Sequence, residues 1–214
     1  MSSMGVWSVV AIRDEDVRRF APLLRPLIEA VAGDPATAER YRWWAAAPER
    51  VRGFRPSPPG SRRLELNEES ESFRCIPAHP LGETRAADPE CAVTRCQDAY
   101  VRAVEPFVAV TRRCDPVAAL FHGLGPARAA ALPGFFGDFI LSSDEAGAAL
   151  PALRAALTFR PGAEREAATA RMRDWLFNLG DADQEPDELF GGLLPCWEHA
   201  VRLGLGLSGV TEHF

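Results

Sequence analysis

The chain contains no lysine, so all 24 of its basic residues are arginines. Arginine stays protonated at any working pH and serves neither as an amine nucleophile nor as a neutral base. The sequence therefore excludes Schiff-base chemistry, a Walker-type phosphate loop and a protein-kinase site, each of which needs a lysine. Long hydrophobic runs are missing as well. No apolar stretch reaches the roughly 18 residues of a membrane helix, so we expect no membrane partner.

The chain has no net positive charge, because its 30 acidic residues outnumber its 24 basic ones and give a net charge of −6. Such a chain lacks a general attraction to nucleic acid or anionic lipid, which argues against nucleic acid as a partner. The apolar run at the start follows no basic segment, unlike a secretory signal. The five cysteines are an odd number. These features predict a cytoplasmic protein with free, buried thiols.

The composition is that of an ordinary folded domain, with 47% hydrophobic and 25% charged residues among 214. We predict one α+β domain over residues 1–214, rich in helix and with a small mixed or antiparallel sheet. The loop GFRPSPPGS at 53–61 is a candidate subdomain junction. Alternation and turn residues predict strands at 5–12 and 137–142 and a hairpin over 62–76.

Prolines and capping residues set the predicted helix limits. Pro22 and Pro26 favour two short pieces over one helix in the first helical stretch. Asp88, followed by a proline, is expected to cap a helix whose apolar stripe runs to Thr111. Asp115 repeats this cap before VAALFHGL. Further helices are predicted from 143, from 161 and from 186.

Arginines and aromatic residues are interleaved over residues 40–63, which contain a single acid. This mixture suits a phosphate, a nucleobase or an acidic partner. The leading functional hypothesis is therefore a binding domain for a protein partner or a small anionic ligand, held by Arg42, Trp43, Trp44, Arg52 and Arg55. The alternative is a solvated surface, because the glutamates that follow the segment can neutralise it across the predicted hairpin.

Histidine, the side chain best suited to acid–base chemistry near neutrality, occurs only four times. The alternative hypothesis is therefore a small enzyme of specialised metabolism that uses His122 or His199 as its acid–base group, with Asp138 or Glu198 beside it. Cys196 and His199 lie on one side of a predicted helix, but a Cys–His nucleophile pair needs a third, orienting group, which the sequence does not identify. A histidine packed in the core or exposed on the surface is the competing structural interpretation.

Metal and cofactor motifs are incomplete. Cys75, His79, Cys91 and Cys96 are soft ligands close in sequence, but their spacings lack the tight cysteine pair of structural zinc. GLGLSG at 204–209 fits the dinucleotide fingerprint, yet it follows a predicted helix and has too few residues after it to form the phosphate-binding helix. We therefore predict buried thiols, no metal and no cofactor.

Four segments resemble, in order, the YfbM-like family of uncharacterised bacterial proteins. They are MGVWSVVAIRDEDV, DPVAALFHGL with Asp115, Phe121 and His122, GFFGDFILSSDEA with Gly137, Leu141, Ser142 and Asp144, and PCWEHAVRLGLG. Residues 40–100 have no counterpart in the family pattern. The family has no agreed activity, so the resemblance implies a fold class and no reaction.

Overall fold

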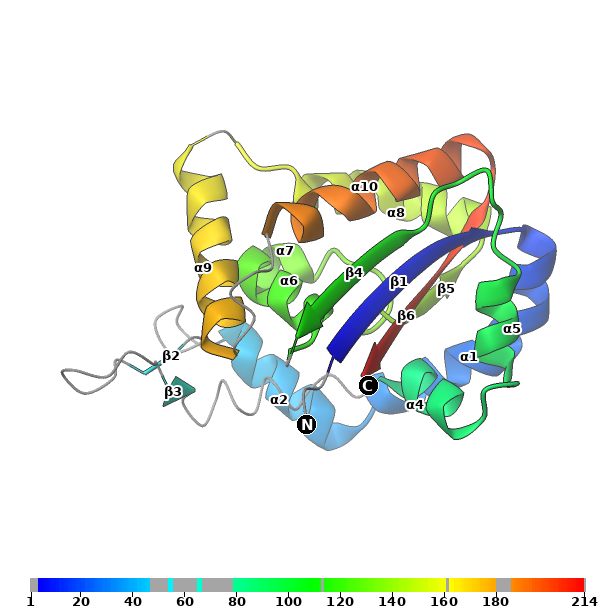
Figure 1. Ribbon diagram of the computed structural model, residues 1–214, viewed down its shortest axis with the longest axis horizontal. Helices are drawn as coiled ribbons and strands as arrows, with labels where there is room; N and C mark the ends of the chain where they lie inside the picture. Colours follow the sequence, from blue (N-terminus) through cyan, green and yellow to red (C-terminus); the bar gives the residue numbers. More distant parts are fainter. Residues whose placement is uncertain are drawn as a thin grey trace.

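A four-stranded antiparallel sheet forms the centre of the structure, a computed structural model (Figure 1). It describes residues 4–46, 54–55, 65–66, 79–112, 114–160, 162–179 and 186–213. The strand order is β4-β1-β6-β5. The strands are β1 (Met4–Ile12), β4 (Phe107–Arg112), β5 (Phe139–Leu141) and β6 (Gly206–His213). The predicted α+β class in a single domain is confirmed.

Helices cover both faces of this sheet (Figure 1). One face packs against α1 (Asp14–Ala32), α4 (Pro80–Ala87) and α5 (Ala92–Asp98). The other packs against α6 (Pro116–Leu124), α8 (Ser143–Leu157) and α10 (Pro186–Arg202), with α9 (Ala163–Leu179) packed on α6. The short helix α7 (Pro126–Ala129) packs on α6 and also contacts α2 (Pro35–Ala46).

Burial on both faces explains the nearly continuous apolar sequence of β1. Val9 faces the core under α6 and α10, whereas its neighbour Val10 faces the core under α1. A strand covered on both sides needs apolar residues at successive positions rather than at alternate ones. The indole of Trp7, buried on the first of these faces, donates to the carbonyl oxygen of Gly137 over 3.1 Å. The predicted strand at 5–12 is thereby confirmed, as is that at 137–142, which contains β5.

The predicted cap at Asp115 is confirmed. The cap predicted at Asp88 is wrong, because the N-cap residue of α5 is Cys91, and α8 is capped by Ser142 rather than by Ser143. Asp115 caps α6, where its side chain accepts from the backbone of Val117 and Ala118. Ser142 and Glu145 form a reciprocal capping box at the start of α8. Such caps satisfy backbone donors that the first helical turn leaves unpaired.

The expectation of two pieces in the first helical stretch is wrong, because α1 is continuous through Pro22 and Pro26. Both prolines lie on the exposed side of the helix, where water can take the carbonyl groups that they leave unbonded. The opposite side buries Phe20, Leu24 and Ile28 in the core. This packing outweighs the cost of the missing hydrogen bonds.

The helix predicted to reach Thr111 is wrong as well. It begins only after Cys91 and ends at Asp98, and the chain then continues into β4. Burial along β4 alternates strictly, which is the pattern of a strand with one face on the core and the other toward solvent.

Within the predicted loop at 53–61, β2 (Phe54–Arg55) pairs with β3 (Glu65–Leu66). The remainder of that loop, the rest of the predicted hairpin and the proposed subdomain junction lie outside the described residues. Among the helices that are described, none is both long and apolar enough to cross a membrane.

Candidate functional site

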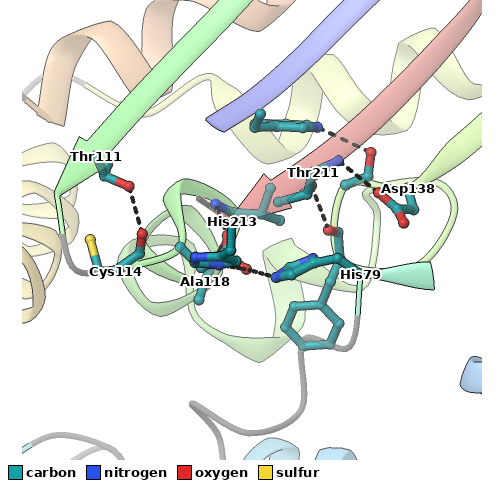
Figure 2. Close-up of polar contacts among 12 residues, drawn as sticks. His79, Thr111, Cys114, Ala118, Asp138, Thr211 and His213 are labelled. Carbon is teal, nitrogen blue, oxygen red and sulfur yellow. Dashed lines mark hydrogen bonds and ion pairs between the residues drawn. The ribbon is translucent and has the colours of Figure 1, made fainter. Parts of the chain in front are cut away.

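Two histidines and an aspartate from distant parts of the sequence meet where β4 and β6 end and β1 begins (Figure 2). His79 precedes α4, Asp115 caps α6, and His213 is the last residue of β6. Nε2 of His79 lies 2.8 Å from Oδ2 of Asp115, and Nε2 of His213 lies 3.9 Å from the same oxygen. One ligand atom from each residue falls within 4.8 Å of the other two. We call these three residues the His–Asp–His cluster.

The backbone of α6 fixes the carboxylate of Asp115. Its Oδ1 accepts hydrogen bonds from the N–H groups of Val117, over 2.6 Å, and Ala118, over 3.1 Å. Thr111 at the end of β4 donates to the carbonyl oxygen of Cys114 over 2.8 Å and so holds the link to α6 (Figure 2). With Oδ1 used by the helix cap, Oδ2 is directed at the two imidazoles.

A second carboxylate, Asp138, fixes the two segments that carry the histidines. It is fully buried, and it accepts from the N–H of Leu81 over 3.0 Å and from the N–H of Thr211 over 2.8 Å. Leu81 follows His79 by two residues, and Thr211 precedes His213 by two residues. Asp138 is therefore a positioning residue, because one side chain sets both histidine backbones relative to each other.

Close packing of α4 on β6 supports the same arrangement. A Cβ atom at Gly82 would lie 2.2 Å from the carbonyl oxygen of Thr211, so only glycine allows this approach. Arg85 on α4 pairs with Glu212 on β6 at 3.2 Å. The first turn of α4, and with it His79, is thus held against the end of β6.

The charges of the site act on one another. Burial alone would lower the pKa of His79, but the negative charges of Asp115, Asp138 and Glu83 outweigh it and raise that pKa. Burial acts to raise the pKa of Asp115, yet His79 and His213 hold it below its ordinary value. Burial raises the pKa of Asp138 to about 7, although N–H groups of Leu81 and Thr211 favour its ionised form. Near neutrality Asp115 is therefore ionised beside an imidazole that binds a proton readily.

Among the three side chains of the cluster, that of His213 is the one exposed to solvent. The side chains of His79 and Asp115 are 8% and 7% exposed, whereas that of His213 is 39% exposed. The two imidazole rings lie 4.9 Å apart. Nδ1 of His79 is buried and finds no hydrogen-bond partner among the described residues. A small ion or molecule would therefore approach past His213.

The two histidines proposed from the sequence lie elsewhere. His122 is buried in the core, where its ring packs at a tilt against Trp175 with the centroids 4.6 Å apart. His199 lines a cavity of about 690 Å³ between β4 and α10, which Glu105 and Glu188 also line. Glu198, expected as its partner, is bound instead by Arg154 of α8 over 2.7 Å.

The proposed arginine–aromatic site is divided by the structure. Arg42 is exposed and lines a second cavity, whereas Trp44 is buried in the core and Trp43 packs partly against that core. Arg52 and the side chain of Arg55 lie outside the described residues. Of the three residues whose side chains are described, Arg42 lines this cavity and the two tryptophans pack on the core.

The thiols follow the prediction where they are described. Cys91, Cys96 and Cys196 are free and buried, Cys114 is buried as well, and burial raises the pKa of Cys96 to about 11. Cys75 lies outside the described residues. His79, grouped with the cysteines in the sequence, instead contacts Asp115 and His213.

Sequence reasoning missed the cluster because no spacing connects its members. Asp115 was recognised only as a helix cap, and His213 belongs to the unpredicted strand β6, which contains the GLGLSG segment. Glycines in that segment serve strand packing: a Cβ at Gly206 would lie 2.4 Å from the carbonyl oxygen of Leu141.

Comparison with protein-family models, curated proteins and solved structures finds no match to the chain. The resemblance to the YfbM-like family stays a prediction. Function is therefore argued from the geometry and chemistry of the site, because a fold class alone does not specify an activity.

Proposed function

We propose that the protein binds one divalent transition-metal ion through His79, Asp115 and His213, and that this ion is the centre of its chemistry. The observation that carries the proposal is the convergence of three ligand atoms within 4.8 Å. Two imidazoles and one carboxylate form a donor set typical of catalytic zinc and of non-haem iron(II) sites.

The distances suit such an ion. Metal–ligand bonds to histidine and carboxylate are about 2.1 Å long, so neighbouring donors around one ion lie roughly 3.0–3.4 Å apart. Oδ2 of Asp115 lies 2.8 Å from Nε2 of His79, just below this range, and 3.9 Å from Nε2 of His213, just above it. His213 is half exposed at a strand end, so a small rotation of its side chain would bring Nε2 into range. The hydrogen bonds to Oδ1 of Asp115 supply the outer contacts that orient a ligand carboxylate.

Three donors converge among the described residues, which is the number typical of a catalytic site rather than a structural one. Structural zinc is enclosed by four protein ligands, whereas catalytic zinc keeps a position for water or substrate. Here that position faces the solvent side of His213. An ion held there would polarise a bound water or a substrate oxygen, which supports hydrolytic chemistry.

The test is metal titration of the purified, chelator-stripped protein with Zn²⁺ and with Co²⁺, followed by calorimetry and by visible absorption. We expect one ion per chain, and we expect the substitution His213→Gln to weaken binding ~100-fold, because it removes a ligand from the exposed side without disturbing the core. The matched control is His199→Gln, which replaces another partly exposed histidine and should bind the metal like wild type. Equal affinity in the His213 variant, or no binding by wild type, would refute the proposal.

Acid should weaken metal binding in the same titration. A metal ion must displace the proton that Asp115 stabilises on His79, whose pKa is raised. We expect the affinity to fall by up to about tenfold per pH unit once the pH drops below the raised pKa of His79. An affinity unchanged from about pH 8 to about pH 6 would show that His79 is not a ligand.

A further inference from the structure

We infer that a second cavity, between α2 and residues 134–136, binds a small carboxylate with an aromatic body. The cavity measures about 440 Å³, within the range of small-molecule sites. Its lining includes Tyr41 and Arg42 of α2 and the aromatic rings of Phe121, Phe135 and Phe136. The inference is independent of the metal proposal, since no member of the His–Asp–His cluster lines this cavity.

The walls provide the apolar part of the site. The rings of Phe121 and Phe136 stack with centroids 4.6 Å apart, and Tyr41 meets Phe136 edge to face at 6.1 Å. Flat aromatic walls of this kind favour a ligand with a planar ring, because offset stacking and edge contacts add to the burial of apolar surface.

Backbone strain at Phe136 is a separate observation that points to the same cavity. Among the described residues, Phe136 is the one non-glycine residue with a positive φ, at 42°. A bulky side chain rarely adopts this conformation, and residues held in it cluster at ligand sites. The turn is fixed because Phe135 and Asp138 exchange backbone hydrogen bonds of 3.0 Å and Thr211 donates to the carbonyl oxygen of Phe136. The strained turn holds the Phe136 ring against Phe121 in the cavity wall.

The positive charge of Arg42 favours an anionic group at the polar end of the ligand. Arg42 lies at the exposed rim, where its Nε donates to the carbonyl oxygen of Ala38 over 3.2 Å and so anchors the guanidinium to its own helix. That bond uses one of five donors, and a guanidinium suits a carboxylate in a bidentate geometry. Burial raises the pKa of Tyr41, so its phenol stays a neutral donor. None of the described residues that line the cavity is acidic.

These features refine the anionic-ligand hypothesis drawn from the sequence. Arg42 keeps the role assigned to it, but its aromatic partners are Tyr41 and three phenylalanines rather than Trp43 and Trp44. The phenylalanines follow α2 in sequence by many residues, and only the fold brings them beside Arg42.

The test is a competition assay with anilinonaphthalene sulfonate as the fluorescent probe, in the presence of EDTA. Naphthaleneacetate should displace the probe, and its neutral analogue naphthaleneacetamide should bind roughly fivefold more weakly, the size expected for an exposed charge pair. Arg42→Gln should abolish this difference. Arg18→Gln, the matched control on the exposed side of α1, should preserve it, and so should His213→Gln.

A second variant tests the cavity itself. Ala130 lines the cavity and is exposed, so Ala130→Trp should fill the space without disturbing the core and weaken both ligands by roughly tenfold or more, at an unchanged melting temperature. Equal binding of acid and amide by wild type would overturn the inference. So would undiminished binding by the folded Ala130 variant, or a wild-type protein that does not bind the probe.

Discussion

Replacing Asp115 by alanine is expected to lower the free energy of unfolding by about 3–5 kcal/mol, the cost of breaking a buried ion pair by removing one partner. The carboxylate caps α6 through Oδ1 and pairs with His79 through Oδ2, and both residues are buried. Loss of the cap alone costs about 1 kcal/mol. The larger part comes from His79, which would keep its burial and lose its partner.

Two substitutions separate these contributions, with urea denaturation as the measurement. Asp115→Asn retains an oxygen that can cap α6 and should recover about 1 kcal/mol relative to alanine. Asp34→Ala is the matched control, because Asp34 accepts from the N–H of Thr37 at the start of α2 but lies on the surface. Asp34→Ala should lower the free energy of unfolding by about 1 kcal/mol, the cost of losing a helix cap alone. If Asp115→Ala were no more damaging than Asp34→Ala, the pair with His79 would contribute nothing to stability.

Elements with local signals could be predicted from the sequence. Asp115 followed by proline specifies a helix start because side chain and backbone act within a few residues of each other. The apolar run of β1 is local in the same sense. Their chemistry does not depend on what the rest of the chain does.

Elements decided by tertiary pairing could not be predicted. Phe107 and Thr111 are four residues apart, a spacing that puts side chains on one face of a helix and equally on one face of a strand. The choice is made by β1, which pairs with β4 in a register that sets Val6 opposite Val110. No feature within residues 92–112 identifies β1 as the partner strand.

The strand β6 could not be predicted because its sequence is rich in glycine. Glycine disfavours strands in general, and GLGLSG also fits an unrelated motif. At Gly209 a Cβ would lie 2.4 Å from the ring of Phe139 on β5, so this strand needs glycine to pair closely with its neighbour. The reason for the residue lies in another strand, which sequence periodicity cannot show.

The same limitation applies to the site. His79, Asp115 and His213 converge because β4 and β6 are separated in the sheet only by β1 and because Asp138 binds the backbone near both histidines. The local role of Asp115 as a cap is predictable, whereas its contact with His79 depends on α4 packing against β6. Residue type alone marks His79 as a possible ligand but does not give its partners.

The remaining prediction with a large effect concerns pH. With metal removed by EDTA, the free energy of unfolding should fall as the pH rises from about 5 to about 8. Burial raises the pKa of Asp138 to about 7 from an ordinary 3.8, so the folded state binds a proton there that the unfolded state has released. Stability from that proton is fully present below about pH 4 and is lost as the pH rises through 7. The pKa of His79, raised by its acidic neighbours, acts in the same direction above its unfolded value of 6.5.

Asp115 does not reverse this decrease in stability between about pH 5 and about pH 8. Its pKa is lowered, so the stability that its ionised form contributes is lost only at lower pH, as the pH falls. A displacement of three pH units at Asp138 corresponds to on the order of 4 kcal/mol over the full titration, of which roughly half or more falls between pH 5 and pH 8.

Urea denaturation of Asp138→Asn should show lower stability, since an amide oxygen can serve only one of the two N–H donors, but a much flatter dependence on pH. Asp34→Asn should keep the wild-type slope, because hydrogen bonds from Thr37 lower the pKa of Asp34 and place its titration below the range. A wild-type stability that rises toward pH 8 would mean that Asp138 is ionised throughout, with its two backbone donors outweighing its burial.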